Sequence, residues 1–593
     1  MSASLRTAGV HYRVDASRVH AHLFSITLTI AQPQARQVVS LPAWIPGSYL
    51  VREFARHLQQ LRATQGRKKL EVTQLDKATW LIDCPSDQAV QLHYEVYAFD
   101  PSVRAAYLDS RRGFFNGTSL CLRVHGQEGL THHLHLLPVR GHADWQVATG
   151  LTPLQCNRQG FGLYAASDYD DLVDCPLEMG HFWSGRFKAC GIEHRLVVAG
   201  APPSFDGSRL LADSQKICEA AIAFWHGKGA QAGRKAPHKN YVFMLHATDD
   251  GYGGLEHRNS TALICNRRDL PRVGESGAPR EGYVTLLGLI SHEYFHTWNV
   301  KRLRPDAFAQ YDYARENYTE LLWFFEGFTS YYDDLLLLRA GLIDTATYIR
   351  LLGKTIQTVQ QMPGRRVQSV AQASFDAWLK YYRVDENTPN ATVSYYAKGA
   401  LVALCLDLSL RQEGHSLDAL MRALWQRCKA GPMREADVLD ALHALTGRSY
   451  KRELQAWVHG TDELPLARLL PAHGVTIHTE AANSAQRLGV RAADAQGSVH
   501  IKTVLRDSPA EAAGLAAQDE WLGLEMGTRG SHGAWRISKL DDVPLLMGRA
   551  REAIMLVARD RQLLRLKFKL PPAASVWRLQ GPDDSARKAW PLV

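Results

Sequence analysis

Three residues between positions 291 and 299 carry side chains that could bind a metal ion and activate a water molecule. They are His292, Glu293 and His296, in the pattern H-E-x-x-H. Residues four apart on an α-helix lie about 40° apart around its axis, so both histidines can contact one ion. Glu293 is turned by about 100° from His292 and can face a water molecule on that ion. This division of roles is typical of metalloproteases, in which zinc and a glutamate general base act together.

Such a site needs a third ligand, and Glu326 is the best candidate. It is the one carboxylate in the apolar run 321–332. A buried carboxylate is costly unless it is paired or bound to a metal. Glu320 is the rival, but it follows polar residues at the edge of the run and is better explained as an exposed or first-turn helix residue. Two histidines and a glutamate can hold a zinc ion that keeps a further position open for water.

Helices are expected to position these residues. Residues 283–290 are apolar and contain no proline, so we predict one buried helix that continues into the motif. From residue 321 to about 460 the sequence has a helical pattern, with one helix starting near Ser394 and another capped by Ser416.

The first 175 residues have the pattern of a β domain. Residues 24–30 and 92–96 alternate apolar and polar side chains, as half-buried strands do. Turn signals recur, for example at Pro46-Gly47. We predict a sandwich-like domain over residues 1–175, in which no catalytic residue can be recognised. A linker is expected near residues 461–483, followed by a small β-rich module.

Composition narrows the class of protein. A chain of 593 residues should form two to four domains. The net charge of +9 is mild and spread out, and no apolar run is long enough to span a membrane, so neither nucleic acid nor a membrane is an expected partner. The nine cysteines lack C-x-x-C spacing, and the N-terminus lacks a signal-peptide pattern, which favours a cytoplasmic protein with reduced thiols. Oligomeric state is left open.

The sequence around the motif resembles the glycyl aminopeptidase family of gluzincin zinc metallopeptidases. The match is most specific over residues 292–302 and 326–332, while residues 44–53 and 112–119 resemble the N-terminal β domain of that family. The resemblance implies a multidomain α+β protein with a thermolysin-like, mostly helical catalytic domain over residues 176–465. It also implies a Zn²⁺ cofactor. The thirty positions from His296 to Glu326 exceed the spacing in better-known gluzincin aminopeptidases, and an insertion near residues 306–316 would explain the difference.

Residues 395–400 resemble the Y-x-K-G-A segment that supplies a catalytic tyrosine in this group of enzymes. Alignment on Lys398, Gly399 and Ala400 selects Tyr396 rather than Tyr395. A phenol can donate a hydrogen bond to the oxyanion of a tetrahedral intermediate. The alternative is an aromatic side chain on a helix surface.

Residues 253–257 resemble the G-x-M-E-N segment of alanyl aminopeptidases, although leucine and histidine replace its methionine and asparagine. The resemblance implies that Gly253, Gly254 and Glu256 bind substrate. An edge strand there could pair with a peptide while Glu256 accepts its α-ammonium group. The alternative is a surface glutamate in a turn, paired with Arg258.

Residues 484–575 resemble a PDZ domain. Residues 487–490 look like its carboxylate-binding loop, and residues 507–515 look like its S-P-A-x-x-A-G-L turn and short helix. Such modules bind a peptide as an added strand and cap its C-terminal carboxylate, so a peptide C-terminus is a candidate partner. A purely architectural role is the alternative.

These features together predict a zinc aminopeptidase that acts on peptide substrates, and the family resemblance implies a preference for N-terminal glycine or alanine. Two alternatives are a zinc endopeptidase or other hydrolase on the same scaffold, and a non-catalytic peptide-binding protein built on the PDZ-like module. The presence of Glu293 beside three intact ligands argues against a decayed active site.

Overall fold

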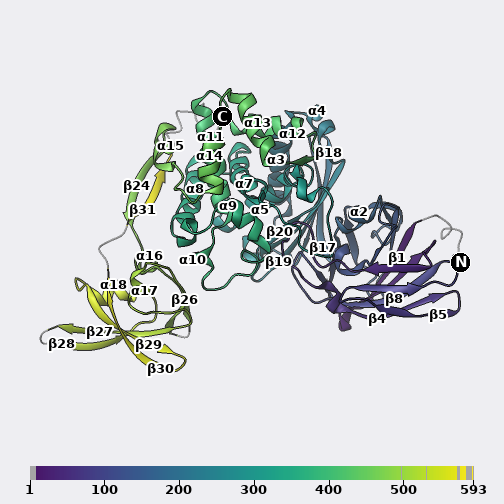
Figure 1. Ribbon diagram of the computed structural model, residues 1–593, viewed down its shortest axis with the longest axis horizontal. Coiled ribbons are helices and arrows are strands. Elements are labelled where there is room, and N and C mark those ends of the chain that lie inside the picture. Colours follow the sequence, from purple (N-terminus) through teal and green to yellow (C-terminus); the bar gives the residue numbers. More distant parts are fainter. Residues whose placement is uncertain (1–8, 496, 529–530, 571–574, 582–589, 592–593) are drawn as a thin grey trace. The chain divides into compact units, whose positions relative to one another are not determined.

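The computed structural model describes residues 9–495, 497–528, 531–570, 575–581 and 590–591 (Figure 1). The chain divides into two compact units. The first contains Met1–Tyr318, Tyr332–Ile343 and Leu424–Arg434, and the second contains Thr319–Tyr331, Asp344–Ala423 and Glu435–Val593. These bounds differ from the three predicted domain ranges, which remain a prediction.

The N-terminal region of the first unit is β-rich, as predicted. One eight-stranded sheet has the order β14-β15-β12-β1-β2-β8-β4-β5, and two four-stranded sheets have the orders β13-β16-β10-β9 and β11-β3-β7-β6. The strands are β1 (Val10–Arg18), β2 (Leu23–Ile30), β3 (Arg36–Ser40), β4 (Leu58–Gln65), β5 (Lys68–Leu70), β6 (Val72–Gln74), β7 (Thr79–Asp83), β8 (Val90–Tyr97), β9 (Ala106–Leu108), β10 (Arg112–Phe115), β11 (Arg123–Val124), β12 (His132–Leu136), β13 (Gln146–Thr149), β14 (Thr152–Cys156), β15 (Gly162–Ala166) and β16 (Leu177–Gly180).

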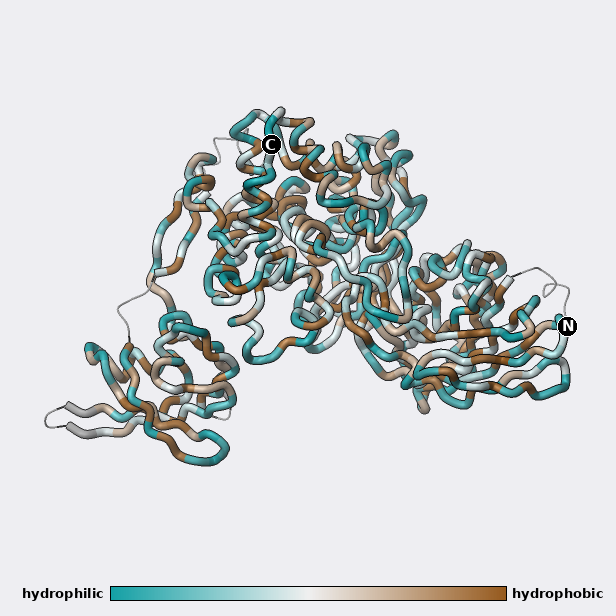
Figure 2. Tube along the Cα trace, in the orientation of Figure 1, coloured by the Kyte–Doolittle hydropathy of each residue, from teal (hydrophilic) through white to brown (hydrophobic). Residues whose placement is uncertain are grey.

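Alternation explains why these segments form strands. In β2 every second side chain, from Phe24 to Ile30, is buried in one apolar core, while the intervening residues are partly exposed. Figure 2 shows hydrophilic and hydrophobic stretches following one another along this region. Strand β16 starts after residue 175 and still pairs with β10 and β13, so this part of the fold continues past the predicted boundary.

A fourth sheet, of mixed strand direction, follows in the same unit, with the order β17-β18-β19-β21-β20. Strands β18, β19 and β21 are parallel neighbours, whereas β20 pairs antiparallel with β21 and forms an edge. Helices α3 and α5 contact each other, and α5 also contacts β20 and β21. The bounds are β17 (Phe182–Ala189), β18 (Ile192–Ala199), β19 (Asn240–Thr248), β20 (Gly253–Glu256), β21 (Ser260–Asn266), α3 (Gly207–His226) and α5 (Glu281–Phe295).

Helices dominate the chain from residue 322 to residue 472, as the sequence pattern predicts. Ser394 and Ser416 accept hydrogen bonds from the amides of Ala397 and Ala419 and so cap α11 and α12. The helices are α6 (Leu322–Phe325), α7 (Gly327–Arg339), α8 (Thr345–Gln360), α9 (Val370–Phe375), α10 (Thr388–Ala391), α11 (Tyr395–Gln412), α12 (Leu417–Arg427), α13 (Glu435–Thr446), α14 (Lys451–Leu454) and α15 (Leu466–Ala472).

One helical stretch among the described residues, Thr388–Gln412, is long and apolar enough to cross a membrane by length and composition. However, 83% of its most apolar window is buried inside the structure. Burial of this extent is what a core helix shows, because its apolar side chains are covered by protein rather than by lipid.

The segment predicted to be a linker, residues 461–483, contains regular secondary structure. Part of it forms α15, and β24 (Thr476–Ala481) pairs antiparallel with β31 (Ser575–Gln580). The module between these strands has a sheet of order β25-β26-β27-β29-β30, with β28 paired to β27. Its elements are α16 (Ser484–Leu488), β25 (Val490–Ala495), β26 (Ser498–Val504), α17 (Pro509–Ala512), β27 (Glu520–Thr528), β28 (Ser531–Arg536), α18 (Asp542–Met547), β29 (Glu552–Arg559) and β30 (Gln562–Lys569).

Candidate metal centre and active site

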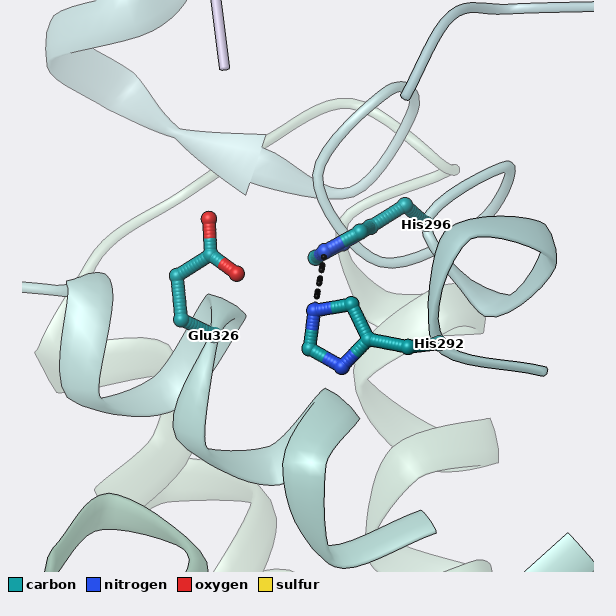
Figure 3. A group of neighbouring side chains, drawn as sticks. All are labelled: His292, His296 and Glu326. Atoms are coloured by element: carbon teal, nitrogen blue, oxygen red, sulfur yellow. Dashed lines mark hydrogen bonds between the residues drawn. The ribbon is translucent and has the colours of Figure 1, made fainter. Parts of the chain in front are cut away.

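The two histidines of the motif point at each other from the end of α5. Their Nε2 atoms are 3.0 Å apart (Figure 3). The Nδ1 of His296 donates to the carbonyl oxygen of Asn299 at 2.7 Å, and the Nδ1 of His292 lies 3.1 Å from Oδ2 of Asp333. A carbonyl oxygen only accepts, so His296 carries its proton on Nδ1 and directs the Nε2 lone pair toward His292. Acceptors on the outer nitrogen are the usual way in which metal-binding histidines are oriented.

Glu326 completes a group that can bind a metal. One ligand atom from each of His292, His296 and Glu326 lies within 4.8 Å of the others, and Figure 3 shows the three side chains facing a common point. Glu326 is only 2% exposed. Nitrogen lone pairs and a carboxylate oxygen directed at one point repel each other unless a cation lies between them. The donor set of two imidazoles and one carboxylate fits Zn²⁺.

Helix geometry explains how Glu326 reaches this position. The Glu326 carbonyl accepts from the amide of Ser330 at 2.8 Å, so Glu326 belongs to the hydrogen-bonded turn that opens α7. Asp333 lies seven residues later, which is two helical turns, and therefore shares a face with Glu326. Asp333 is also the residue that contacts His292. The turn that opens α7 thus carries the third candidate ligand, and the same face of α7 carries the residue that contacts the first candidate.

Glu293 lies against the edge strand β20. A Cβ placed on Gly254 would be 2.1 Å from Oε1 of Glu293, so any side chain at this position would displace that carboxylate. Carboxylate oxygens of Glu256 and Glu293 and a ring nitrogen of His296 form a second group whose atoms lie within 4.8 Å of one another. The general-base candidate, one metal-ligand candidate and the substrate-anchor candidate are therefore neighbours.

Glu256 is the last residue of β20 and is 4% exposed, which argues against the surface-turn alternative. Arg258 does not pair with it. Instead the Arg258 amide donates to Oδ2 of Asp174 at 2.9 Å. The Glu256 carboxylate lies against Gly47, where a Cβ would be 2.6 Å from both oxygens.

Asp174 is the centre of a buried charge network next to this anchor. It accepts from Nζ of Lys301 at 2.7 Å and lies 3.4 Å from Nδ1 of His257. Burial alone would raise the pKa of Asp174, but the charge of Lys301 and the bond from His257 outweigh it, so the pKa lies well below its usual range. The network ties the turn after Glu256 to Lys301, which follows the motif helix.

Tyr396 stands in the first turn of α11, where Glu326 is one of the groups that act on it electrostatically. Burial raises the pKa of Tyr396 well above its usual value, and the Glu326 carboxylate raises it further. The phenol is therefore protonated at neutral pH and can donate a hydrogen bond. The ring of Tyr381 stacks on Tyr396 with centroids 5.5 Å apart, and burial also raises the pKa of Tyr381. Tyr381 is a neighbour that the sequence pattern did not single out.

Two further residues near the site come from the β-rich region, in which no catalytic residue was predicted. They are Gly47, beside Glu256, and Arg104, whose Nη2 donates to the Gly254 carbonyl oxygen at 3.2 Å. The predicted insertion near residue 312 packs against the loop that carries Gly47, because Nε1 of Trp44 donates to the Asp312 carbonyl at 2.8 Å. The family-like stretch 44–53 was a signal for Gly47, whereas no feature of the sequence marked Arg104.

Comparison with known proteins identifies the family. A model of the Peptidase M61 N-terminal domain matches residues 11–181, and a model of the M61 glycyl aminopeptidase matches residues 285–402. The crystal structure of an aminopeptidase N family protein from Idiomarina loihiensis is 37% identical, with a TM-score of 0.90, and the match covers 97% of this chain and 98% of that chain. Among curated proteins none matches.

Two crystal structures of M1 zinc metallopeptidase mutants from Deinococcus radiodurans, one of them bound to a Tyr-Ser-Ala substrate, are 14% identical. Their TM-scores are 0.47 and 0.48, and the matches cover 77% of this chain and 94% and 95% of those chains. Similarity this distant supports no conclusion about this protein. The M61 matches and the match to the Idiomarina protein show that the chain belongs to the M61 peptidase family and is a peptidase.

Proposed function

We propose that this protein is a zinc-dependent aminopeptidase that removes N-terminal residues from peptides. The observation that carries the proposal is the buried Glu256 carboxylate at the end of an edge strand, grouped with Glu293 and His296. An exopeptidase must recognise the free α-ammonium of its substrate, and a desolvated carboxylate beside the general base provides that recognition.

His292, His296 and Glu326 would hold the zinc ion of a thermolysin-like catalytic domain. When bound, zinc polarises the scissile carbonyl and lowers the pKa of a water molecule. Glu293 takes the proton from the attacking water and passes it to the leaving amine. Tyr396 donates a hydrogen bond to the oxyanion, since its raised pKa keeps the phenol protonated.

The backbone of β20 would bind the substrate. An edge strand can pair with an extended peptide, and the absence of a side chain on Gly253 lets the peptide come close, whereas Glu293 fills the space beside Gly254. We also propose a preference for N-terminal glycine or alanine. The family resemblance implies this preference.

The decisive experiment combines Glu256→Gln with N-acetylated substrates. Loss of one side of a desolvated charge pair costs about 2–5 kcal/mol, so we expect kcat/KM on free-amine peptides to fall by a factor of about 30 or more. Zinc content should not change. The wild type should not cleave acetylated peptides. Comparable wild-type rates on acetylated and free peptides would refute the aminopeptidase assignment and favour an endopeptidase.

A second candidate function concerns the C-terminal module. We propose that it is PDZ-like and binds a peptide along β25, which is an edge strand of its sheet. The stretch expected to be the carboxylate-binding loop differs from that expectation. Arg487 lies within helix α16, and the amides of Arg487 and Gly489 already donate to the carbonyls of Asn483 and Ala485. Strand pairing rather than carboxylate capping should therefore dominate binding.

Peptide binding by this module can be separated from catalysis. Pro at position 492 of β25 removes one backbone donor from the strand. Titration of the full chain with labelled peptides should show weaker binding in Ala492→Pro and an unchanged rate on di- and tripeptides. Amidation of the peptide C-terminus should have little effect on affinity. Unaltered affinity in the variant would leave an architectural role as the explanation of the module.

A further inference from the structure

Arg104 lies beside the open edge of the sheet that carries the proposed ammonium anchor. Its Nη2 donates to the carbonyl oxygen of Gly254 at 3.2 Å. Nη1 and Nη2 also lie 3.7 Å and 3.8 Å from the position that a Cβ would take on Gly253. The guanidinium therefore runs along the backbone of β20 at the end away from Glu256.

The charge of Arg104 is not neutralised within the part of the chain that the structure describes. No carboxylate there forms an ion pair with it, and its buried Nε has no hydrogen-bond partner. A guanidinium is always charged and offers five N–H donors in a planar fork. One of them is used on Gly254. Nε is buried, so the remaining Nη donors are the ones left for a ligand, and a carboxylate is the group whose geometry they match.

The residues that would act on a substrate follow a fixed order along β20. Glu256 is at one end, Gly254 lies against Glu293, and Gly253 is at the other end beside Arg104. An extended chain rises about 3.4 Å per residue, so the two or three residues from Glu256 to Gly254 or Gly253 span about 7–10 Å. An extended dipeptide or tripeptide spans about the same length between its ammonium and its carboxylate.

We infer that Arg104 binds the C-terminal carboxylate of a di- or tripeptide whose N-terminal ammonium is held by Glu256. This inference rests on the proposed function and specifies its substrate class, which is short peptides with both ends free. Glu256 and Arg104 carry opposite charges at the two ends of β20, so together they select substrates by length. A longer peptide has a neutral amide beside Arg104 and loses the contact between two charges.

The test compares Ala-Ala-Ala with its C-terminal amide, Ala-Ala-Ala-NH₂, on the wild type and on Arg104→Gln. Glutamine keeps an N–H donor for the Gly254 carbonyl but lacks the positive charge and the paired N–H donors of the guanidinium. We expect the wild type to prefer the acid by about ten-fold or more in kcat/KM, mainly through KM. In Arg104→Gln the preference should fall to about two-fold or less, with unchanged zinc content and thermal midpoint.

Arg111→Gln is the matched control, because Arg111 is an exposed arginine seven residues further along the chain. It should retain the wild-type preference for the acid. Equal wild-type rates on acid and amide would overturn the inference, and so would an unchanged preference in Arg104→Gln. A wild type that cleaves neither free-amine tripeptide would instead refute the proposed function itself, which makes the two failures distinguishable.

Discussion

At the scale of single residues, two glycines shape the site because they carry no side chain. The carboxylate of Glu293 occupies the space that a Cβ at position 254 would need. The carboxylate of Glu256 likewise occupies the space that a Cβ at position 47 would need. Alanine at position 254 would force Glu293 away from its place, because an atom at 2.1 Å cannot be accommodated. The two glycines therefore leave the room that these two carboxylates occupy.

Tyr396 gives the first prediction at this scale. Tyr396→Phe should lower kcat by about two to three orders of magnitude, because one hydrogen-bond donor to the oxyanion is lost. Tyr395 is fully buried and adjacent, and its phenylalanine variant should keep kcat within a few-fold. Steady-state kinetics on a glycyl or alanyl peptide would measure both. A large loss in Tyr395→Phe with a normal Tyr396→Phe would show that the assignment is off by one residue.

At the scale of elements, charges reinforce the turn of the hairpin β20–β21, whose own backbone bond runs from the His257 amide to the Ser260 carbonyl. Asp174 binds the Arg258 amide and the Lys301 ammonium, and so fixes the turn just after Glu256. Nearby Glu256 also raises the pKa of Lys301, although Asp174 contributes more and burial opposes both. Asp174 thus keeps Lys301 from becoming the main partner of Glu256.

Asp174→Asn should therefore damage both stability and substrate binding. Breaking a buried ion pair on one side typically costs about 3–5 kcal/mol. With Asp174 neutral, Lys301 turns to Glu256 and competes with the substrate ammonium, so KM for free-amine peptides should rise by about ten-fold while kcat changes less. Adding Lys301→Met to the variant should restore much of the KM. If KM stays normal in Asp174→Asn, the network has only a structural role.

At the scale of the whole molecule, buried histidines should make stability depend on pH. His194 on β18 is 1% exposed, and its Nε2 lies 2.9 Å from the hydroxyl of Tyr294 behind the motif helix. Burial lowers the pKa of His194 to about 4. The unfolded chain has a histidine pKa of about 6.5, so it binds more protons between these values. The stability from neutral His194 is thus present above pH 6.5 and is lost as pH falls toward 4.

We expect this histidine to contribute a slope of about 1.4 kcal/mol per pH unit across that window. His194→Gln should flatten the decline of the thermal midpoint between pH 6.5 and pH 4.5 relative to the wild type. His181→Gln, at an exposed histidine, is the control and should follow the wild-type profile. Parallel profiles for the wild type and His194→Gln would contradict the prediction.

Several candidate residues could be named from the sequence because their placement depends on local geometry. The spacing of His292 and His296 places them on one helix face whatever the rest of the chain does, since backbone hydrogen bonds fix the helical repeat. Glu326 could be proposed as a ligand because a lone carboxylate in an apolar run needs a partner, and the structure brings it near both histidines. The β-rich region and the helices capped by Ser394 and Ser416 followed from alternation and capping, which are also local.

Tertiary structure alone decided what surrounds these groups. Arg104 reaches Gly254 across 150 positions of sequence, and no periodicity marks an arginine in a loop as a neighbour of a distant strand. The proximity of Gly47 and Asp174 to Glu256 could also be recognised only in the structure, because the register and packing of whole sheets bring them together. Residues 487–490 show the opposite case. The sequence there resembles a carboxylate-binding loop, but the amides of Arg487 and Gly489 donate to carbonyls of helix α16 and its N-cap. Backbone donors pair locally when a helix can form.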